Sequence, residues 1–214
     1  MLSIKRFTFN HFATNCYVIY NEASKVCAIV DPTAETLHEE SRLAQFIDQH
    51  ELTPLYVMLT HAHVDHLAGL KNVCDRYRLP VTMHSDGVPL LSQAFAYGQM
   101  MGFSVSGLEG LSVHCIDDKE RLVLDDVEIE CRAVPGHCPG SMCYVLHKER
   151  QVITGDALFR LSIGRTDLPG GDYDLLIQKI KEEILSLGED FQILPGHGDD
   201  STIGYEISCN GFLI

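Results

Sequence analysis

Apolar runs of different periodicity divide the N-terminal half of the chain into predicted strands and helices. Two short runs rich in β-branched and aromatic residues, 17–20 and 26–30, flank five mostly polar residues, which predicts a hairpin. Between residues 34 and 49 the apolar positions keep helical spacing. The continuous apolar run 55–59 follows, and such a run is typical of a buried strand. The pattern therefore predicts a sheet that begins with a hairpin, and a helix then connects the second hairpin strand to a further strand.

The C-terminal half repeats this arrangement. Residues 122–124 and 127–133 flank an Asp-Asp turn, and apolar residues alternate with Glu and Arg in the second run, which predicts a hairpin with one face in solvent. Further strands are predicted at 141–146, 152–154 and 191–194. Asp172 or Asp174 can cap a helix whose Leu and Ile residues share one stripe. The whole chain predicts an α/β protein in which helices cover the outer faces of two sheets.

Composition narrows the class of protein. The chain has 214 residues, 45% of them apolar, and no Pro/Ser linker or charge block, so we expect one domain over 1–214. Sixteen Lys and Arg against thirty Asp and Glu give a net charge of −14, which disfavours nucleic acid and anionic membranes as partners. Without a signal-peptide pattern or an apolar run near the ~20 residues that span a bilayer, a cytoplasmic protein is expected.

The densest group of polar side chains follows directly after the predicted strand 55–59. The segment 60–66 reads Thr-His-Ala-His-Val-Asp-His and contains four metal-ligand side chains, a density that packing does not require. Residues two apart on an extended segment point the same way, so His61 and His63 can bind one ion. Asp65 and His66 lie where the chain turns into the next helix and can address a second ion.

Three more candidate ligands also lie at strand ends beside glycine. They are His137 in Pro-Gly-His, Asp156 in Thr-Gly-Asp and His197 in Pro-Gly-His-Gly. Glycine permits the backbone bends that turn such side chains inward. Any one of these residues alone is weak evidence, but together with the 61–66 cluster they predict a site for two metal ions.

The order of these motifs resembles the metallo-β-lactamase superfamily. The resemblance extends from residue 16 to residue 206 and includes Gly-His-Cys-Pro-Gly-Ser at 136–141. It implies a four-layer αββα sandwich of two similar halves with a binuclear site at one edge of the sheets. By the same resemblance the first ion is held by His61, His63 and His137. The second is held by Asp65, His66 and His197, and Asp156 bridges both.

Within the superfamily the chain is similar to compact, single-domain glyoxalase II. The segment 159–172 matches the loop that those proteins carry after Gly-Asp, whereas true β-lactamases lack the bridging Asp156. The resemblance implies a hydroxyacylglutathione hydrolase that converts S-lactoylglutathione and water to lactate and glutathione. A metal ion can lower the pKa of water to about 7, so the chain needs no Ser or Cys nucleophile. Asp65 is expected to orient the attacking hydroxide.

Substrate recognition rests on fewer residues. Arg165 corresponds to a basic residue that similar loops direct at the glutathione moiety, and the alternative is a solvated loop charge. Cys138 replaces the usual Thr of the family, and we expect it to pack rather than to bind metal. We also expect ordinary core packing for four apolar residues, with a cover over the pocket mouth as the alternative: Tyr97, Met100, Met101 and Phe103.

Other functions compete with thioester hydrolysis. A persulfide dioxygenase with a single iron shares Gly-Arg-Thr-Asp at 164–167, but it tends to have Asp where this chain has Pro139 and Ala before the histidine that corresponds to His197 in Pro-Gly-His-Gly. Another metallo-hydrolase of the superfamily and a non-catalytic, metal-stabilised scaffold are the further alternatives. Five His and two Asp without Cys suit zinc, iron and manganese, and zinc is the metal that we expect. The expected partner is a small-molecule thioester.

Overall fold

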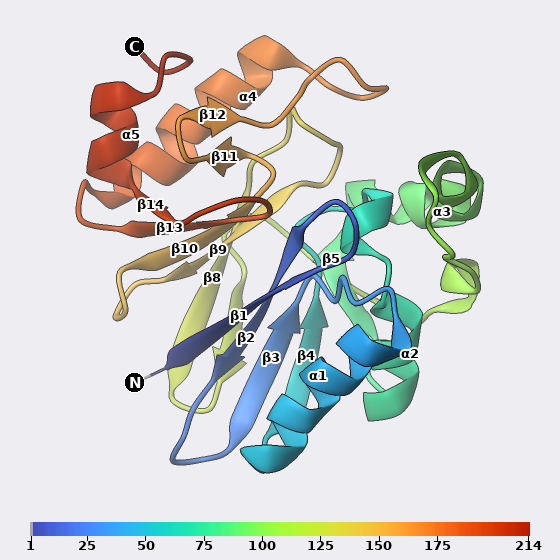
Figure 1. Ribbon diagram of the computed structural model, residues 1–214. Coiled ribbons are helices and arrows are strands. Elements are labelled where there is room, and N and C mark those ends of the chain that lie inside the picture. Colours follow the sequence, from blue (N-terminus) through green and yellow to red (C-terminus); the bar gives the residue numbers. More distant parts are fainter. Residues whose placement is uncertain (1) are drawn as a thin grey trace.

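Two six-stranded β-sheets face each other in the computed structural model, which describes residues 2–214 (Figure 1). The first sheet contains, in order, β1 (Ser3–Phe9), β2 (Thr14–Tyr20), β3 (Val26–Val30), β4 (Thr53–Met58), β5 (Val81–His84) and β6 (Val113–Ile116). The second contains, in order, β14 (Ser201–Thr202), β13 (Gln192–Pro195), β10 (Gln151–Gly155), β9 (Met142–Leu146), β8 (Val127–Ala133) and β7 (Arg121–Leu124). A small hairpin pairs β11 (Leu158–Phe159) with β12 (Ser162–Ile163).

Helices cover the outer face of each sheet (Figure 1). They are α1 (Leu37–Gln49), α2 (Leu70–Tyr77) and α3 (Val88–Met101) on the first sheet, and α4 (Tyr173–Lys179) and α5 (Ile203–Cys209) on the second. A π-helical turn, Ile180–Ile184, continues α4. Within residues 2–214 the helices are all too short or too polar to cross a membrane. The predicted layered α/β architecture is confirmed.

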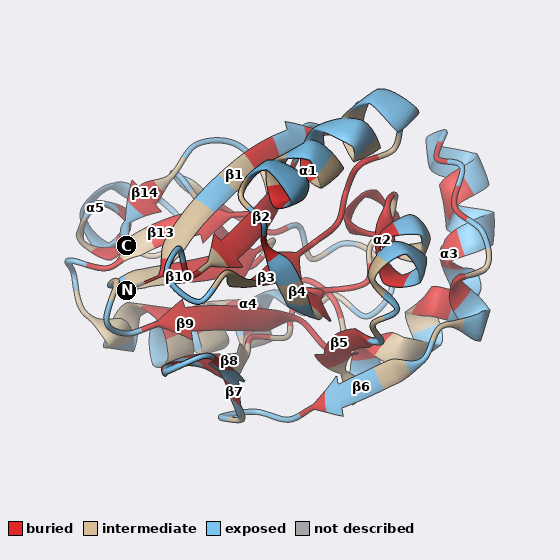
Figure 2. Ribbon diagram, turned by 90° about the horizontal axis from the view of Figure 1, so that it is seen from below, coloured by how far each residue is buried: buried red, intermediate tan, exposed pale blue. Residues whose placement is uncertain are grey.

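Strand side chains alternate between two cores. In β2, Tyr17 and Ile19 pack between the sheets, whereas Cys16 and Val18 pack beneath the helices of the first sheet. Both sets are fully buried, because the sheet is covered on both faces (Figure 2). This double burial explains why β2 and β3 appear in the sequence as continuous apolar runs.

Local signals fix two of the helices. Thr36 and Glu39 form a capping box at the start of α1, in which each side chain accepts a hydrogen bond from the other residue's backbone N–H. Asp172, one of the two predicted caps, accepts a hydrogen bond from the Leu175 N–H at the start of α4. The buried Leu176 of α4 then packs against the second sheet.

Two details of the sequence prediction are wrong. Glu130 of β8, predicted to face solvent, is 8% exposed, because Arg132 Nε donates to it at 2.9 Å and His147 also contacts its carboxylate. The helix expected to follow directly after Asp65 and His66 begins only at Leu70, because Val64–His66 forms a 3-10 turn first. The extra turn keeps Asp65 and His66 outside the regular helix.

The strand directions bring five chain segments to one edge of the sandwich. β3 and β4 are parallel in the first sheet, and β10 and β13 are parallel in the second, so their carboxyl ends point the same way. β8 runs in the same direction as β10, because each is antiparallel to β9. The segments that follow these strands therefore meet at one edge of the sandwich, between the two sheets.

Candidate metal centre

Seven side chains from both sheets meet at this edge. They form three groups whose ligand atoms lie within 4.8 Å of one another: His61, His63 and His137; His61, His66 and Asp156; Asp65, His66 and His197. All seven candidate ligands from the sequence are thus brought together. Two of the groups have the membership that the family resemblance implies for the first and second ion.

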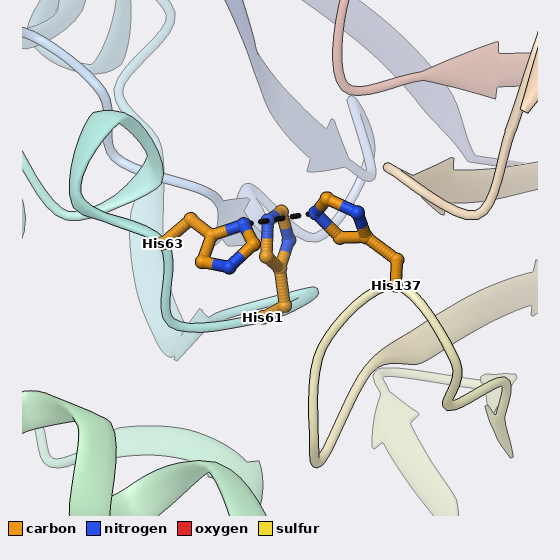
Figure 3. Close-up of side chains that lie close together, drawn as sticks. All are labelled: His61, His63 and His137. Atoms are coloured by element: carbon orange, nitrogen blue, oxygen red, sulfur yellow. Dashed lines mark hydrogen bonds between the residues drawn. The ribbon is translucent and has the colours of Figure 1, made fainter. Parts of the chain in front are cut away.

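The first group consists of histidines alone. His63 Nδ1 lies 2.8 Å from His137 Nε2, and the His61 ring is directed between them (Figure 3). Burial, together with the neighbouring His137, lowers the pKa of His63 to about 4, and burial lowers the pKa of His61 and of His137 as well. The three imidazoles are therefore neutral at pH 7, and a neutral imidazole is the form that binds a metal ion.

The second group combines carboxylates with histidines. His197 Nε2 lies 3.1 Å from Asp65 Oδ2 and 3.5 Å from Asp156 Oδ2, and His66 Nε2 lies 3.3 Å from Asp156 Oδ1. Although burial opposes it, hydrogen bonds with Asp156 and Asp65 raise the pKa of His197 to about 9. His66 and His197 hold the pKa of Asp156 well below its usual range, again against burial. A buried pair of carboxylates requires positive charge nearby, which a divalent cation supplies.

Four of the five histidines have their second ring nitrogen fixed by a residue outside the ligand set. His137 Nδ1 donates to the Arg165 carbonyl at 2.7 Å, and His197 Nδ1 donates to the Phe12 carbonyl at 3.1 Å. Asp31 accepts from His66 Nδ1 at 2.9 Å, and Thr60 Oγ1 lies 3.1 Å from His61 Nδ1. Each contact fixes a tautomer that leaves Nε2 free for the centre of the cluster, as in metal-binding histidines generally.

Three buried polar atoms at the centre have no hydrogen-bond partner: His61 Nε2, His66 Nε2 and Asp156 Oδ1. Buried polar atoms in folded proteins are nearly always paired, so three unpaired atoms in one cluster need an explanation. All three belong to residues of the metal-ligand groups. The donor set therefore fits divalent metal ions on its own geometry.

Glycines allow the backbone to come this close to the cluster. A Cβ atom at Gly196 would lie 2.1 Å from Asp156 Oδ1 and 2.9 Å from the His66 ring. Gly155 has a φ of +49°, in the left-handed region, and a Cβ there would lie 2.5 Å from Thr60 Oγ1. The glycines beside the candidate ligands thus allow the backbone to pack close to the cluster, in addition to allowing it to bend.

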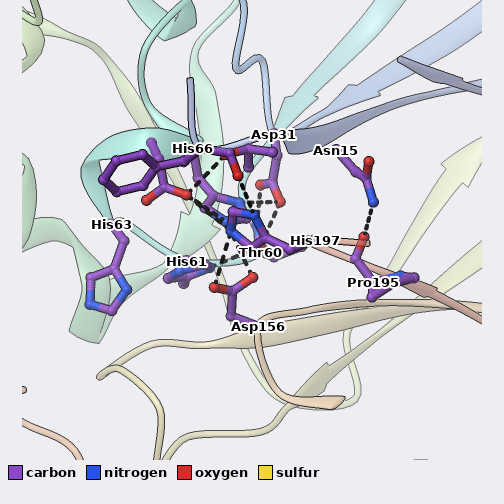
Figure 4. Close-up of polar contacts among 12 residues, drawn as sticks. Asn15, Asp31, Thr60, His61, His63, His66, Asp156, Pro195 and His197 are labelled. Atoms are coloured by element: carbon purple, nitrogen blue, oxygen red, sulfur yellow. Dashed lines mark hydrogen bonds and ion pairs between the residues drawn. The ribbon is translucent and has the colours of Figure 1, made fainter. Parts of the chain in front are cut away.

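Asp31 is a functional residue that the sequence interpretation missed. It is fully buried at the end of β3, where it accepts hydrogen bonds from the Thr60 N–H at 2.7 Å, from Thr60 Oγ1 at 2.6 Å and from His66 Nδ1 (Figure 4). It therefore orients His66 directly and His61 through Thr60. The signal was the one used for the other candidates, a carboxylate directly after a buried strand, but Asp31 has no adjacent ligand motif.

Substituting Asp31 by Asn should weaken the metal site without removing any candidate ligand. The amide cannot accept all three of these hydrogen bonds, so His66 loses its fixed tautomer. We expect a loss of about 10- to 100-fold in metal affinity or activity, the usual cost of losing such a supporting partner. Competition with a coloured chelator measures the affinity. Asp48→Asn, at an exposed carboxylate paired with Arg76, is the matched control, and equal effects of the two substitutions would contradict the role of Asp31.

Arg165 and Cys138 lie at the site in different ways. The Arg165 side chain lies at the rim, 59% exposed, where Nε and Nη2 donate to Asp167 at 2.7 and 2.8 Å. Cys138 is 1% exposed, and burial raises the pKa of its thiol to about 11. Among residues 2–214, no group of potential metal ligands includes Cys138, which agrees with the expected packing role.

A pocket of about 300 Å³ opens onto the cluster. Its lining combines candidate ligands with apolar side chains: Phe12, Ala62, His63, Val64, Asp65, Leu90, Gln93, Ala94, Tyr97, Met101, His137, Asp156, Arg165, Leu168, Pro169 and His197. Phe103 is buried, as expected of core, but the core prediction is wrong for three residues. Tyr97 and Met101 line the pocket at 40% and 41% exposure, and Met100 is 77% exposed.

Two facing sheets covered by helices, with a His/Asp cluster at their common edge, define a metallo-hydrolase type of protein. The profile of the metallo-beta-lactamase superfamily matches residues 10–197, and the chain belongs to this family. Hydroxyacylglutathione hydrolase GloC of Haemophilus influenzae is 33% identical over 207 residues, which cover 94% of this chain and 93% of that protein. The fold, the cluster and this relationship indicate a metal-dependent hydrolase with a binuclear site.

Solved structures agree closely with the fold. The crystal structure of BLEG-1 B3 metallo-beta-lactamase has a TM-score of 0.88 and 33% identity, covering 99% of each chain. That of TTHA1623 in a di-iron-bound form has a TM-score of 0.87 and 31% identity, covering 98% of this chain and all of that one. The second structure shows that a similar chain holds two metal ions.

Proposed function

We propose that this protein is a thioester hydrolase of the glyoxalase II type, with S-lactoylglutathione as a substrate. The observation that carries the proposal is the pair of ligand groups joined by Asp156 beneath an open pocket. The similarity to hydroxyacylglutathione hydrolase GloC supports the choice of reaction. Zinc is the metal that we propose, although the ligand set also suits iron and manganese.

Each part of the reaction can be given to bound ions or to residues of the ligand groups. Divalent ions bound there would supply a nucleophile from water at neutral pH and polarise the thioester carbonyl. The Asp65 carboxylate lines the pocket and orients the attacking water. A C–O bond forms as the C–S bond breaks, and the proton lost by water ends on the departing thiolate. Because a thiolate is a good leaving group, the pocket needs no separate general acid.

A three-substrate assay tests this proposal. Protein of measured metal content is given S-lactoylglutathione, glutathione persulfide with an oxygen electrode, and a chromogenic β-lactam. We expect rapid release of glutathione from the thioester and background rates with the other two. Oxygen consumption without thioester hydrolysis would replace the proposal with the dioxygenase function, and cleavage of the β-lactam alone would favour the activity named for BLEG-1.

Arg165 is the residue that we propose for glutathione recognition. Asp167 occupies two of its N–H donors and holds the guanidinium at the pocket rim, which leaves three donors for a substrate carboxylate. Arg165→Ala should raise KM about tenfold, the size expected from losing ~1.5 kcal/mol of a charge-assisted hydrogen bond. The rate at saturation should barely change, because the contact is present in both ground and transition states.

Two controls separate recognition from structure. Arg160→Ala removes an exposed arginine that stacks on Tyr205 away from the pocket lining, and it should leave KM unchanged. A small thioester without glutathione should be hydrolysed equally by wild type and Arg165→Ala. Equal losses on both substrates would mean that Arg165 supports the loop or the metal site instead, and an unchanged KM would remove its role in recognition.

A further inference from the structure

Helix α3 presents an apolar wall to the pocket. None of its fourteen residues carries a charge, and Tyr97 and Met101 line the pocket while still 40% and 41% exposed. Phe12, on the turn between β1 and β2, also lines the pocket at 44% exposure. Large apolar side chains left open in a concave pocket favour a ligand group that covers them.

The wall is held in place by contacts outside the metal cluster. His11 Nδ1 lies 3.0 Å from Glu35 Oε2, and His11 Nε2 lies 3.2 Å from the Met101 carbonyl, so this ring joins the β1–β2 turn to the end of α3. The Phe103 ring packs against the His11 ring and the Phe12 ring, with distances between ring centroids of 4.3 Å and 5.1 Å. The apolar side chains are therefore preformed for binding.

Phe12, one member of the apolar wall, and Arg165 lie beside different ligand groups of the cluster. The Phe12 carbonyl accepts from His197, which places Phe12 beside the second ligand group. The Arg165 carbonyl accepts from His137, which places the cationic end beside the first. A substrate that spans the cluster thus has one part near the Arg165 guanidinium and the other near the apolar Phe12 side chain.

We propose that Phe12, Tyr97 and Met101 form a subsite for an apolar acyl side chain, aromatic or branched aliphatic, larger than the methyl group of lactoyl. This inference rests on the proposed thioester hydrolysis, with the charged thiol portion at Arg165. A methyl group covers little of these three side chains, whereas a phenyl ring matches their size. The preferred substrates are then 2-hydroxyacyl thioesters with a bulky apolar acyl group.

Two thioesters of the same thiol test the acyl preference. S-mandeloylglutathione and S-lactoylglutathione differ only by phenyl in place of methyl. We expect wild type to favour the mandeloyl ester about tenfold in kcat/KM, as burial of a phenyl ring allows. Because phenyl also changes intrinsic reactivity, the ratio between the two esters is compared across variants. Met101→Ala should lower the ratio about threefold.

Met100→Ala provides the matched control. This neighbouring methionine is 77% exposed and is not part of the pocket lining, so its loss should leave both rates and their ratio unchanged. Thermal unfolding of both variants shows whether α3 remains folded. An unchanged ratio in Met101→Ala, or an equal decrease in Met100→Ala, would overturn the subsite.

A binding experiment without turnover distinguishes the subsite from the proposed function. Calorimetry compares the two inert thioethers S-benzylglutathione and S-methylglutathione on the metal-loaded protein. We expect the benzyl compound to bind about tenfold more tightly, and Met101→Ala to reduce this difference. Tighter benzyl binding without hydrolysis of either thioester would leave the subsite standing and refute the hydrolase. Hydrolysis of both thioesters with no preference for the phenyl-bearing compound, in rate or in binding, would refute the subsite alone. Hydrolysis without detectable binding of either thioether would also refute it.

Discussion

Treatment with a strong chelator should remove close to two metal ions per chain and reduce thioester hydrolysis to the background rate. The seven ligand side chains suffice for two sites only if Asp156 is shared. Without ions, His61 Nε2 and His66 Nε2 are buried and unpaired, and no protein nucleophile is proposed that could replace water activation. The expected loss is therefore complete rather than partial. Elemental analysis before and after chelation gives the stoichiometry.

Reconstitution controls this experiment. Adding zinc, iron or manganese separately to the chelated protein should restore activity, with saturation at two equivalents, while circular dichroism shows that the fold survives chelation. Full thioester hydrolysis with a single ion per chain would remove the binuclear mechanism. Full activity with no ion at all would refute metal catalysis.

The candidate ligands could be found from the sequence because the information is local. Four of them fall within 61–66, directly after a buried strand, and the other three each follow a strand and stand beside glycine. Strand ends are recognisable from apolar runs, and parallel strands place their carboxyl ends together. The structure brings these residues to one edge for that reason.

The residues that the sequence did not predict depend on three-dimensional packing. Asp31 stands alone at the end of β3, and only the fold places its carboxylate against Thr60 and His66. Tyr97 and Met101 belong to a helix that is apolar on most sides, so periodicity could not separate the buried face from the pocket face. Such a helix reads as core, although part of its surface forms the wall of the site.

Glu130 shows the same limit in a strand. Alternation in β8 predicts an outward-facing carboxylate, but Arg132 and His147 bury it by contact. A period of two identifies the face of a sheet on which a side chain lies, but not what covers that face. Neighbouring side chains, here Arg132 on the same strand and His147 just after β9, therefore decide burial.

Substituting Asp65 by Ala should damage turnover far more than folding. Its carboxylate accepts a hydrogen bond from Thr14 Oγ1 at 3.0 Å and lies 3.1 Å from His197 Nε2. The first ligand group, His61, His63 and His137, does not include it and should keep one ion. We expect kcat to fall by more than about 100-fold, beyond the usual cost of losing a supporting partner, with about one ion per chain retained.

Stability should change little, because removing Asp65 also removes a buried negative charge that lies close to Asp156. We expect the unfolding free energy of the chelated protein to change by less than about 2 kcal/mol, within the usual range for a point substitution. Asp75→Ala, at an exposed carboxylate on α2 paired with Lys71, is the control that should leave kcat unchanged. Asp65→Asn keeps the side-chain volume and repeats the test if the alanine variant does not fold. Near-native kcat with S-lactoylglutathione, together with a lowered metal content, would show that the second ion is not catalytic and that Asp65 orients no water.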